Sequence, residues 1–182
     1  MSEASHSILI VEDNADDLFI LKRAFRLAGT PNDLHHAEHG QQAIDYLAGV
    51  GPYDDRSTHP LPSLVLLDLK LPVKHGLEVL AWIKAQPSCR GIVVVILTSS
   101  NEDKDVSRAY DLGASAFLVK PTSAEKLTEI VRALDLFWLR HNKYRAHGQN
   151  HRYKAAAASR SLQHHGRRHL RNRSMRKSAR RP

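Results

Sequence analysis

The stretch SILIVEDNADDLFILKRAFRLA, residues 7–28, contains the unit from which we predict the fold. Its first five residues, Ser7–Val11, are mostly aliphatic or β-branched, which favours a strand buried on both faces. From Asp16 to Ala28, apolar residues recur at steps of three and four, which indicates a helix with one apolar face. Two acids, Glu12 and Asp13, stand between the strand and the helix.

The same alternation of apolar runs and amphipathic stretches repeats through residue 139. Five βα units in a row indicate a doubly wound α/β fold with a five-stranded parallel sheet. We expect capping boxes at the start of the last two helices, formed by Ser100 with Asp103 and by Thr122 with Glu125. The further expected strands are Asp33–Ala37, Leu64–Leu67, Ile92–Leu97 and Ala116–Val119, and the further helices are Gly40–Ala48, Leu77–Ala85, Asp103–Leu112 and Ala124–Arg140.

The charge is distributed unevenly along the chain. Of the 27 Lys and Arg residues, 14 lie in residues 140–182, which contain no Asp or Glu. That segment also has few large apolar residues, so it cannot bury enough surface to offset the entropy of ordering it. We therefore expect one domain at residues 1–140, followed by a disordered basic tail at residues 141–182.

Cysteine usage and hydropathy indicate the compartment. The chain has one cysteine, Cys89, which excludes an internal disulfide framework and fits a reducing environment. No apolar run approaches the roughly 20 residues that a membrane-spanning helix needs. We expect a cytoplasmic protein without a membrane span.

Polar residues of matched chemistry follow four of the predicted strands. In an open parallel sheet, ligands bind beyond the carboxyl ends of the strands. Clustered carboxylates favour a hard divalent cation such as Mg²⁺, and an aspartate can act as a nucleophile towards phosphorus. A lysine there would neutralise charge on the transferred group. The residues at these strand ends are Glu12, Asp13, Asp68, Thr98 and Lys120.

These observations predict a site at which an aspartate accepts a phosphoryl group. Asp16 and Asp17 have a simpler interpretation, because acids in the first turn of a helix stabilise its N-terminus.

Four segments resemble the receiver domains of bacterial response regulators, over about Ile8–Leu139. They are VEDNADD (11–17), LVLLDLKLPVKHGLEVL (64–80), VVVILTSSNEDKDV (93–106) and GASAFLVKP (113–121). The resemblance implies a flavodoxin-like receiver fold that binds Mg²⁺. It implies roles for seven residues, namely Glu12 and Asp13 as the acidic metal pair, Asp68 as phosphoacceptor, Lys70 as a metal ligand through its backbone carbonyl, Thr98 as the switch hydroxyl, Phe117 as the switch aromatic and Lys120 as the lysine of the site. It also implies a cis peptide between Lys120 and Pro121.

Within this family, the long Gly49–Ser63 loop and the DLFWL sequence at Asp135–Leu139 resemble stand-alone regulators paired with phytochrome-type histidine kinases. The resemblance implies a sensor histidine kinase as partner. Phosphorylation would shift the population of two arrangements, with Thr98 moving towards the phosphate and Phe117 turning into the vacated space. Two positions depart from the family pattern: Lys70 stands where Asn is frequent, and His75, where an acid is frequent, is interpreted as a residue at the start of a helix.

The end of the last predicted helix carries three consecutive large apolar residues, Phe137, Trp138 and Leu139. Three neighbours span more than half of the helix circumference, so at least one should face outward. Exposed apolar groups commonly mark an interface, and we predict a homodimer through this helix. The alternative is that the tail covers them.

Two other functions compete with a protein-binding switch. The basic tail could bind nucleic acid under control of the receiver, although it has only two aromatic residues for stacking and no helix-turn-helix pattern. A hydrolase with an aspartate nucleophile is disfavoured, since the second acid of dehalogenase-like phosphatases is replaced by Lys70. We therefore expect no enzyme activity beyond self-phosphorylation and autodephosphorylation.

Overall fold

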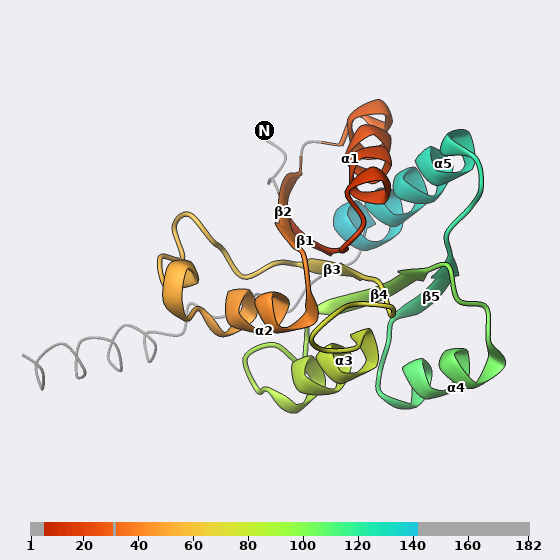
Figure 1. Ribbon diagram of the computed structural model, residues 1–182. Helices are drawn as coiled ribbons and strands as arrows, with labels where there is room; N and C mark the ends of the chain where they lie inside the picture. Colours follow the sequence, from red (N-terminus) through yellow and green to blue (C-terminus); the bar gives the residue numbers. More distant parts are fainter. Residues whose placement is uncertain (1–5, 31, 142–182) are drawn as a thin grey trace, which may run out of the picture. The chain divides into compact units, whose positions relative to one another are not determined.

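A computed structural model describes residues 6–30 and 32–141, and residues 142–182 lie outside the described part of the chain (Figure 1). Five parallel strands form one sheet in the order β2-β1-β3-β4-β5. The predicted doubly wound α/β fold is confirmed. The strands are β1 Ser7–Val11, β2 Asp33–Ala37, β3 Leu64–Leu67, β4 Val93–Thr98 and β5 Ala116–Val119, and the helices are α1 Ala15–Ala28, α2 Gly40–Ala48, α3 Gly76–Ala85, α4 Asp103–Asp111 and α5 Ala124–Leu134.

The helices cover both faces of the sheet, with α1 and α5 on one face and α2, α3 and α4 on the other (Figure 1). Alternating strand residues therefore enter two separate apolar clusters. Leu9 and Val11 of β1 pack with α2 and α3, whereas Ile8 and Ile10 pack with α1 and α5. Strands β3 and β4 are buried along their whole length, as expected for central parallel strands.

The starts of the last two helices differ from the prediction. Glu102, not Ser100, is the N-cap of α4, and the Ser100 hydroxyl donates instead to Asp105 at 2.8 Å. Ser123, not Thr122, caps α5 by accepting from the Lys126 N–H. Adjacent polar residues compete for these positions, and only the entry angle of the backbone decides between them. A capping box does occur at α3, where His75 is the N-cap, in line with its interpretation as a helix-start residue.

The end of the last helix also differs from the prediction. The α-helix ends at Leu134, and residues Asp135–His141 continue as a wider π-helix. The buried Asp135 accepts hydrogen bonds from Asn32 and Arg140.

None of the helices in the described residues is long and apolar enough to cross a membrane.

The predicted dimer surface needs a correction. Leu139 is only 4% exposed and belongs to the core beside α1 and α5, so it is not available to a partner. Trp138 is half-buried against the same core, whereas Phe137 is 60% exposed. The wider π-helix turns Leu139 inward, which the sequence alone did not indicate.

The loop Gly49–Ser63 packs on α2 and the edge strand β2. Tyr46 of α2 contacts the rings of Tyr53 and His59 from the loop and of His35 from β2. Arg56 donates to the carbonyls of Tyr46 and Leu47, which are the terminal acceptors of α2. The loop is therefore an ordered part of the domain.

We expect the His35 side chain to make stability pH-dependent. Burial, with a smaller contribution from His59, lowers the pKa of His35 below its ordinary 6.5, against the opposing effect of Asp33. The unfolded chain therefore binds a proton more readily than the folded one, and stability falls as the pH drops below about 6.5. Urea unfolding at pH 7.5, 6.5 and 5.5 should show that the free energy of unfolding falls less with pH in His35→Gln than in wild type. An equal fall in both proteins would contradict the assignment to His35.

Candidate functional site

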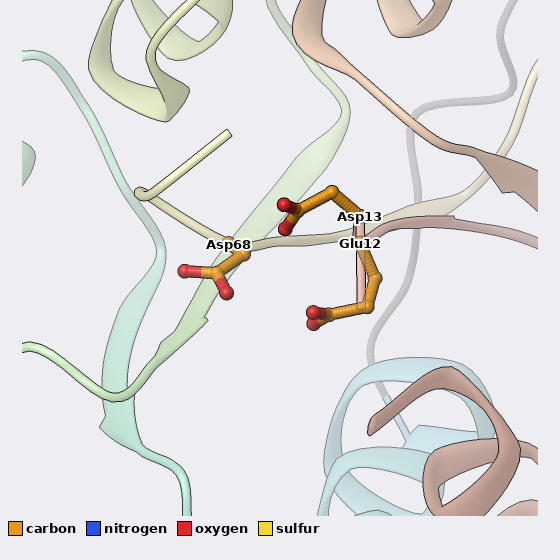
Figure 2. A group of neighbouring side chains, drawn as sticks. All are labelled: Glu12, Asp13 and Asp68. Carbon is orange, nitrogen blue, oxygen red and sulfur yellow. The ribbon is translucent and has the colours of Figure 1, made fainter. Parts of the chain in front are cut away.

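The carboxyl ends of β1, β3, β4 and β5 bring together most of the predicted site residues. Glu12 and Asp13 follow β1, Asp68 follows β3, and carboxylate oxygens of these three residues lie within 4.8 Å of one another. Figure 2 shows the three side chains side by side at this edge of the sheet. Glu12 and Asp68 are buried, at 4% and 5% exposure, while Asp13 is open to solvent.

Lys120, directly after β5, is the cation of the site. Its Nζ lies 2.7 Å from Glu12, 2.8 Å from Asp68 and 2.8 Å from Asp17. Register places it there, because Thr98 and Val119 pair across β4 and β5 and the Lys120 N–H then donates to the Thr98 carbonyl. The expected cis peptide before Pro121 is wrong: no cis bond occurs in residues 6–30 and 32–141.

The pKa values of the two buried carboxyls, Glu12 and Asp68, are shifted in opposite directions. Burial would raise the pKa of Asp68, but hydrogen bonds from Lys120, Thr98 and the Lys70 N–H outweigh it and hold that pKa below 3.8. For Glu12, burial outweighs the contribution of Lys120, and the pKa is raised above 4.5. The Lys120 pKa is raised, because three carboxylate hydrogen bonds outweigh its desolvation. Of the two buried carboxyls, Asp68 is therefore the one that gives up its proton more readily.

The loop after β3 holds Asp68 in place. The Asp68 N–H donates to the Val11 carbonyl at 3.1 Å, and the Lys70 N–H donates to Asp68 Oδ1 at 3.2 Å. The Lys70 side chain itself is exposed. At the start of α3, Gly76 lies so close to this loop that a Cβ would be 2.2 Å from the Asp68 carbonyl oxygen. Only glycine fits this approach of two backbone segments.

The proposed switch residues lie on neighbouring strands. Thr98, the last residue of β4, is fully buried, and its hydroxyl is among the groups that lower the pKa of Asp68. Phe117, opposite Ile96 in the sheet register, is half-buried against the core beneath α3 and α4. Thr98 thus influences Asp68 electrostatically, and Phe117 lies on the adjacent strand.

Two contacts of the site were not predicted. Asp17 was interpreted as a residue that favours the helix start, yet its carboxylate pairs with Lys120. The ring of His36 hydrogen-bonds the Glu12 carbonyl at 2.8 Å. No sequence signal distinguishes Asp17 from Asp16, because the rotation of α1 relative to β5 decides which of the two faces Lys120. His36 could have been suspected only from its place one residue before the end of β2.

The donor set fits a divalent cation. Three carboxylates in mutual reach are hard oxygen ligands that repel one another without a cation between them. Glu12, Asp13 and Asp68 are the residues that would hold such an ion, which would supply positive charge beside the acceptor oxygen. In the described part of the chain, these three form the acidic group with metal-binding spacing.

Comparison with known proteins gives the class of this chain. Residues 8–132 match the model of the response regulator receiver domain family, and the chain belongs to this family. It is a receiver of two-component signalling, and proteins of this class are signalling switches that bind divalent metal at an acidic site.

Relatives place the chain more narrowly within that class. It is 38% identical to the probable methanogenesis regulatory protein FilR2 of Methanothrix harundinacea, over 75% of this chain and 85% of that protein. It is 36% identical to the response regulator Rcp1 of Synechocystis sp., over 72% of this chain and 88% of Rcp1. A crystal structure of Rcp1 with bound Mn²⁺ superposes with a TM-score of 0.70 at 34% identity, covering 78% of this chain and 99% of that one.

The phosphorylated cyanobacterial phytochrome response regulator RcpA is also similar in structure. Its crystal structure gives a TM-score of 0.73 at 34% identity, and the match covers 79% of this chain and all of RcpA. The relatives therefore include stand-alone and phytochrome response regulators, as the sequence resemblance implied.

Proposed function

We propose that Asp68 accepts a phosphoryl group from the phosphohistidine of a sensor histidine kinase. The observation that supports this best is the Asp68 carboxylate, held by Lys120 at 2.8 Å and grouped with Glu12 and Asp13 within 4.8 Å. Its low pKa keeps it ionised and able to attack. A bond forms from an Asp68 oxygen to phosphorus, the phosphorus–nitrogen bond breaks, and the imidazole that leaves takes a proton from solvent.

Mg²⁺ is the proposed metal, bound by the carboxylates of Glu12, Asp13 and Asp68 and by the Lys70 carbonyl. Hard oxygen ligands and room for phosphate oxygens suit this ion. Lys120 would then donate to a phosphoryl oxygen. Later attack of water on the phosphorus would release inorganic phosphate and restore the Asp68 carboxylate.

The signal would be read as a population shift. The Thr98 hydroxyl, which contributes to the lowered pKa of Asp68, would turn to a phosphoryl oxygen, and Phe117 would move towards the space left behind. A tenfold shift needs roughly 1.4 kcal/mol, which is about the net value of one charge-assisted hydrogen bond. The output would be a change in protein–protein interactions.

The kinase is proposed to be of the phytochrome type, on the similarity to RcpA and Rcp1. The nucleic-acid alternative rests on residues 142–182, which lie outside the described part of the chain. The hydrolase alternative gains no support at the site, because the side chain two residues after Asp68 is the exposed cation Lys70.

Incubation with acetyl phosphate and Mg²⁺, read by intact mass, tests the proposed phosphorylation. We expect one phosphoryl group on wild type, none on Asp68→Asn and none in excess chelator. Asp111→Asn, an exposed acid at the end of α4, is the control and should be labelled as wild type is. Phosphotransfer from purified kinases then tests the kinase type: labelling by other kinases but not by a phytochrome kinase would overturn the phytochrome assignment alone.

The Lys70 side chain is expected to alter the lifetime of the phosphoryl group. The side chain is an exposed cation two residues from the acceptor, and the backbone N–H of Lys70 donates a hydrogen bond to the Asp68 carboxylate. We expect Lys70→Ala to change the rate of autodephosphorylation by about twofold or more, corresponding to roughly 0.4 kcal/mol in the barrier. Lys70→Arg, which keeps the charge, should remain closer to wild type. Equal rates in all three proteins would refute the role.

The homodimer remains a proposal, now centred on Phe137 and Trp138. Sedimentation should show a dimer for wild type and a shift to monomer for Phe137→Glu. Leu27→Glu, at an apolar position on α1 that is 54% exposed, is the control and should stay dimeric. A monomer at high concentration, unchanged by Trp138→Ala, would defeat the idea.

A further inference from the structure

The third carboxylate on Lys120 comes from a helix, not from a strand end. Asp17 lies in the first turn of α1, and its Oδ2 is 2.8 Å from Lys120 Nζ. Glu12 and Asp68 take the other two positions, at 2.7 and 2.8 Å. A lysine ammonium has three N–H donors, so these carboxylates account for all of them. Asp17 is outside the acidic group that could hold a cation, which consists of Glu12, Asp13 and Asp68.

Capping of α1 does not require the Asp17 side chain. The Asn14 side chain caps the helix by accepting the N–H groups of Asp16 at 2.9 Å and Asp17 at 3.0 Å. Both acids lie in the same turn and contribute alike to the helix dipole. Of these two acids, only Asp17 forms an ion pair with Lys120 among the described contacts. The difference between the two neighbours is therefore the contact with Lys120.

Asp17 also differs from the other two partners in exposure. Its side chain is 43% exposed, whereas those of Glu12 and Asp68 are 4% and 6% exposed. Asp17 is therefore the carboxylate partner of Lys120 that water reaches most freely. Because Asp17 lies outside the acidic group, it would still be a carboxylate partner of Lys120 if Glu12 and Asp68 gave their oxygens to a cation.

We propose that Asp17 is a positioning residue that holds Lys120 at the edge of the site and reduces its competition with the cation for Glu12 and Asp68. This inference rests on the proposed function of the same site. With Asp17 holding one N–H, the other two N–H groups are directed at Glu12 and at the acceptor Asp68, and they can turn to phosphoryl oxygens. Without it, Lys120 pairs only with Glu12 and Asp68, and the site loses one negative charge. Both effects oppose cation binding.

Asp17→Asn tests the inference, with Asp16→Asn as a control of equal charge change in the same helical turn. We expect the Asp17 variant to bind Mg²⁺ about fivefold more weakly, which equals roughly 1 kcal/mol, and the Asp16 variant to bind as wild type does. Binding is read from amide NMR shifts of the unphosphorylated protein. In metal-free protein, the ¹⁵N signal of Lys120 Nζ should move in the Asp17 variant only, and Asp17→Glu should restore both readouts in part.

Phosphorylation by acetyl phosphate at subsaturating Mg²⁺ should be slowed in Asp17→Asn by a similar factor. Wild-type Mg²⁺ affinity and an unmoved Lys120 signal in Asp17→Asn would overturn the inference. Equal weakening by Asp16→Asn would also overturn it, because a general loss of negative charge would then explain the result. If wild type takes up no phosphoryl group, the proposed function fails, while the Mg²⁺ and Lys120 readouts still decide the role of Asp17.

Discussion

Replacing Lys120 by alanine is expected to lower the free energy of unfolding by about 3 kcal/mol at neutral pH, because it leaves buried carboxylates unpaired. Glu12 and Asp68 are nearly inaccessible to water, and both are bonded to this ammonium. The value lies at the lower end for a broken buried ion pair, since Asp13 and Asp17 reach solvent. Urea unfolding measures it. Lys104→Ala, which removes an exposed pair with Glu102, should have no measurable effect.

The loss of unfolding free energy in Lys120→Ala should depend on pH and on Mg²⁺. The raised pKa of Lys120 means that its contribution is present at neutral pH and is lost only as the pH rises above about 10.5. The lowered pKa of Asp68 means that its contribution is present above about 3.8 and is lost as the pH falls through the folded value. Wild type and Lys120→Ala should therefore differ at neutral pH and converge in acid, as the orphaned carboxyls protonate. Mg²⁺ should also restore stability to the variant. If the difference in unfolding free energy between wild type and Lys120→Ala stayed the same in acid and in the presence of Mg²⁺, this account would be contradicted.

Gly76→Ala is expected to be the other strongly damaging substitution. Its Cβ would lie 2.2 Å from the Asp68 carbonyl oxygen and 2.7 Å from the Leu69 Cα, and both of these are backbone atoms. The loop after β3 must move, so we expect a loss of about 3 kcal/mol in stability and slower phosphorylation, because Asp68 moves with the loop. Thermal unfolding and acetyl phosphate labelling measure the two effects.

Gly29→Ala is the control for this glycine. An added Cβ at Gly29 meets nothing within 4 Å, but φ is +70°, so the cost is backbone strain alone, about 1 kcal/mol. Phosphorylation of this variant should be normal. If Gly76→Ala were as stable and as readily labelled as Gly29→Ala, the close approach of α3 to the acceptor loop would not constrain the site.

The sheet and its site edge could be predicted from sequence because their signals are local. Four of the five strands have the predicted bounds, and the fourth begins and ends one residue later than predicted, at Val93–Thr98. Buried parallel strands have uninterrupted apolar runs, and the polar residue after each run is then placed by topology alone. This is why the sequence alone could assign Glu12, Asp13, Asp68 and Lys120 to one site.

The errors concern features that depend on packing between elements. The Asp17–Lys120 pair depends on the rotation of α1 relative to β5, which a carboxylate in the first turn does not reveal. The inward position of Leu139 depends on the π-helix after Leu134. The caps of α4 and α5 depend on the direction in which the chain leaves β4 and β5. Each of these outcomes is determined by tertiary contacts.

The most direct test of the central claim is to locate the phosphoryl group chemically. Borohydride reduces an acyl phosphate to an alcohol, which converts a phosphorylated aspartate to homoserine. After treatment with acetyl phosphate, Mg²⁺ and borohydride, peptide mass spectrometry should find homoserine at position 68. Homoserine at another aspartate, or unmodified Asp68 in protein that carries the label, would contradict the account.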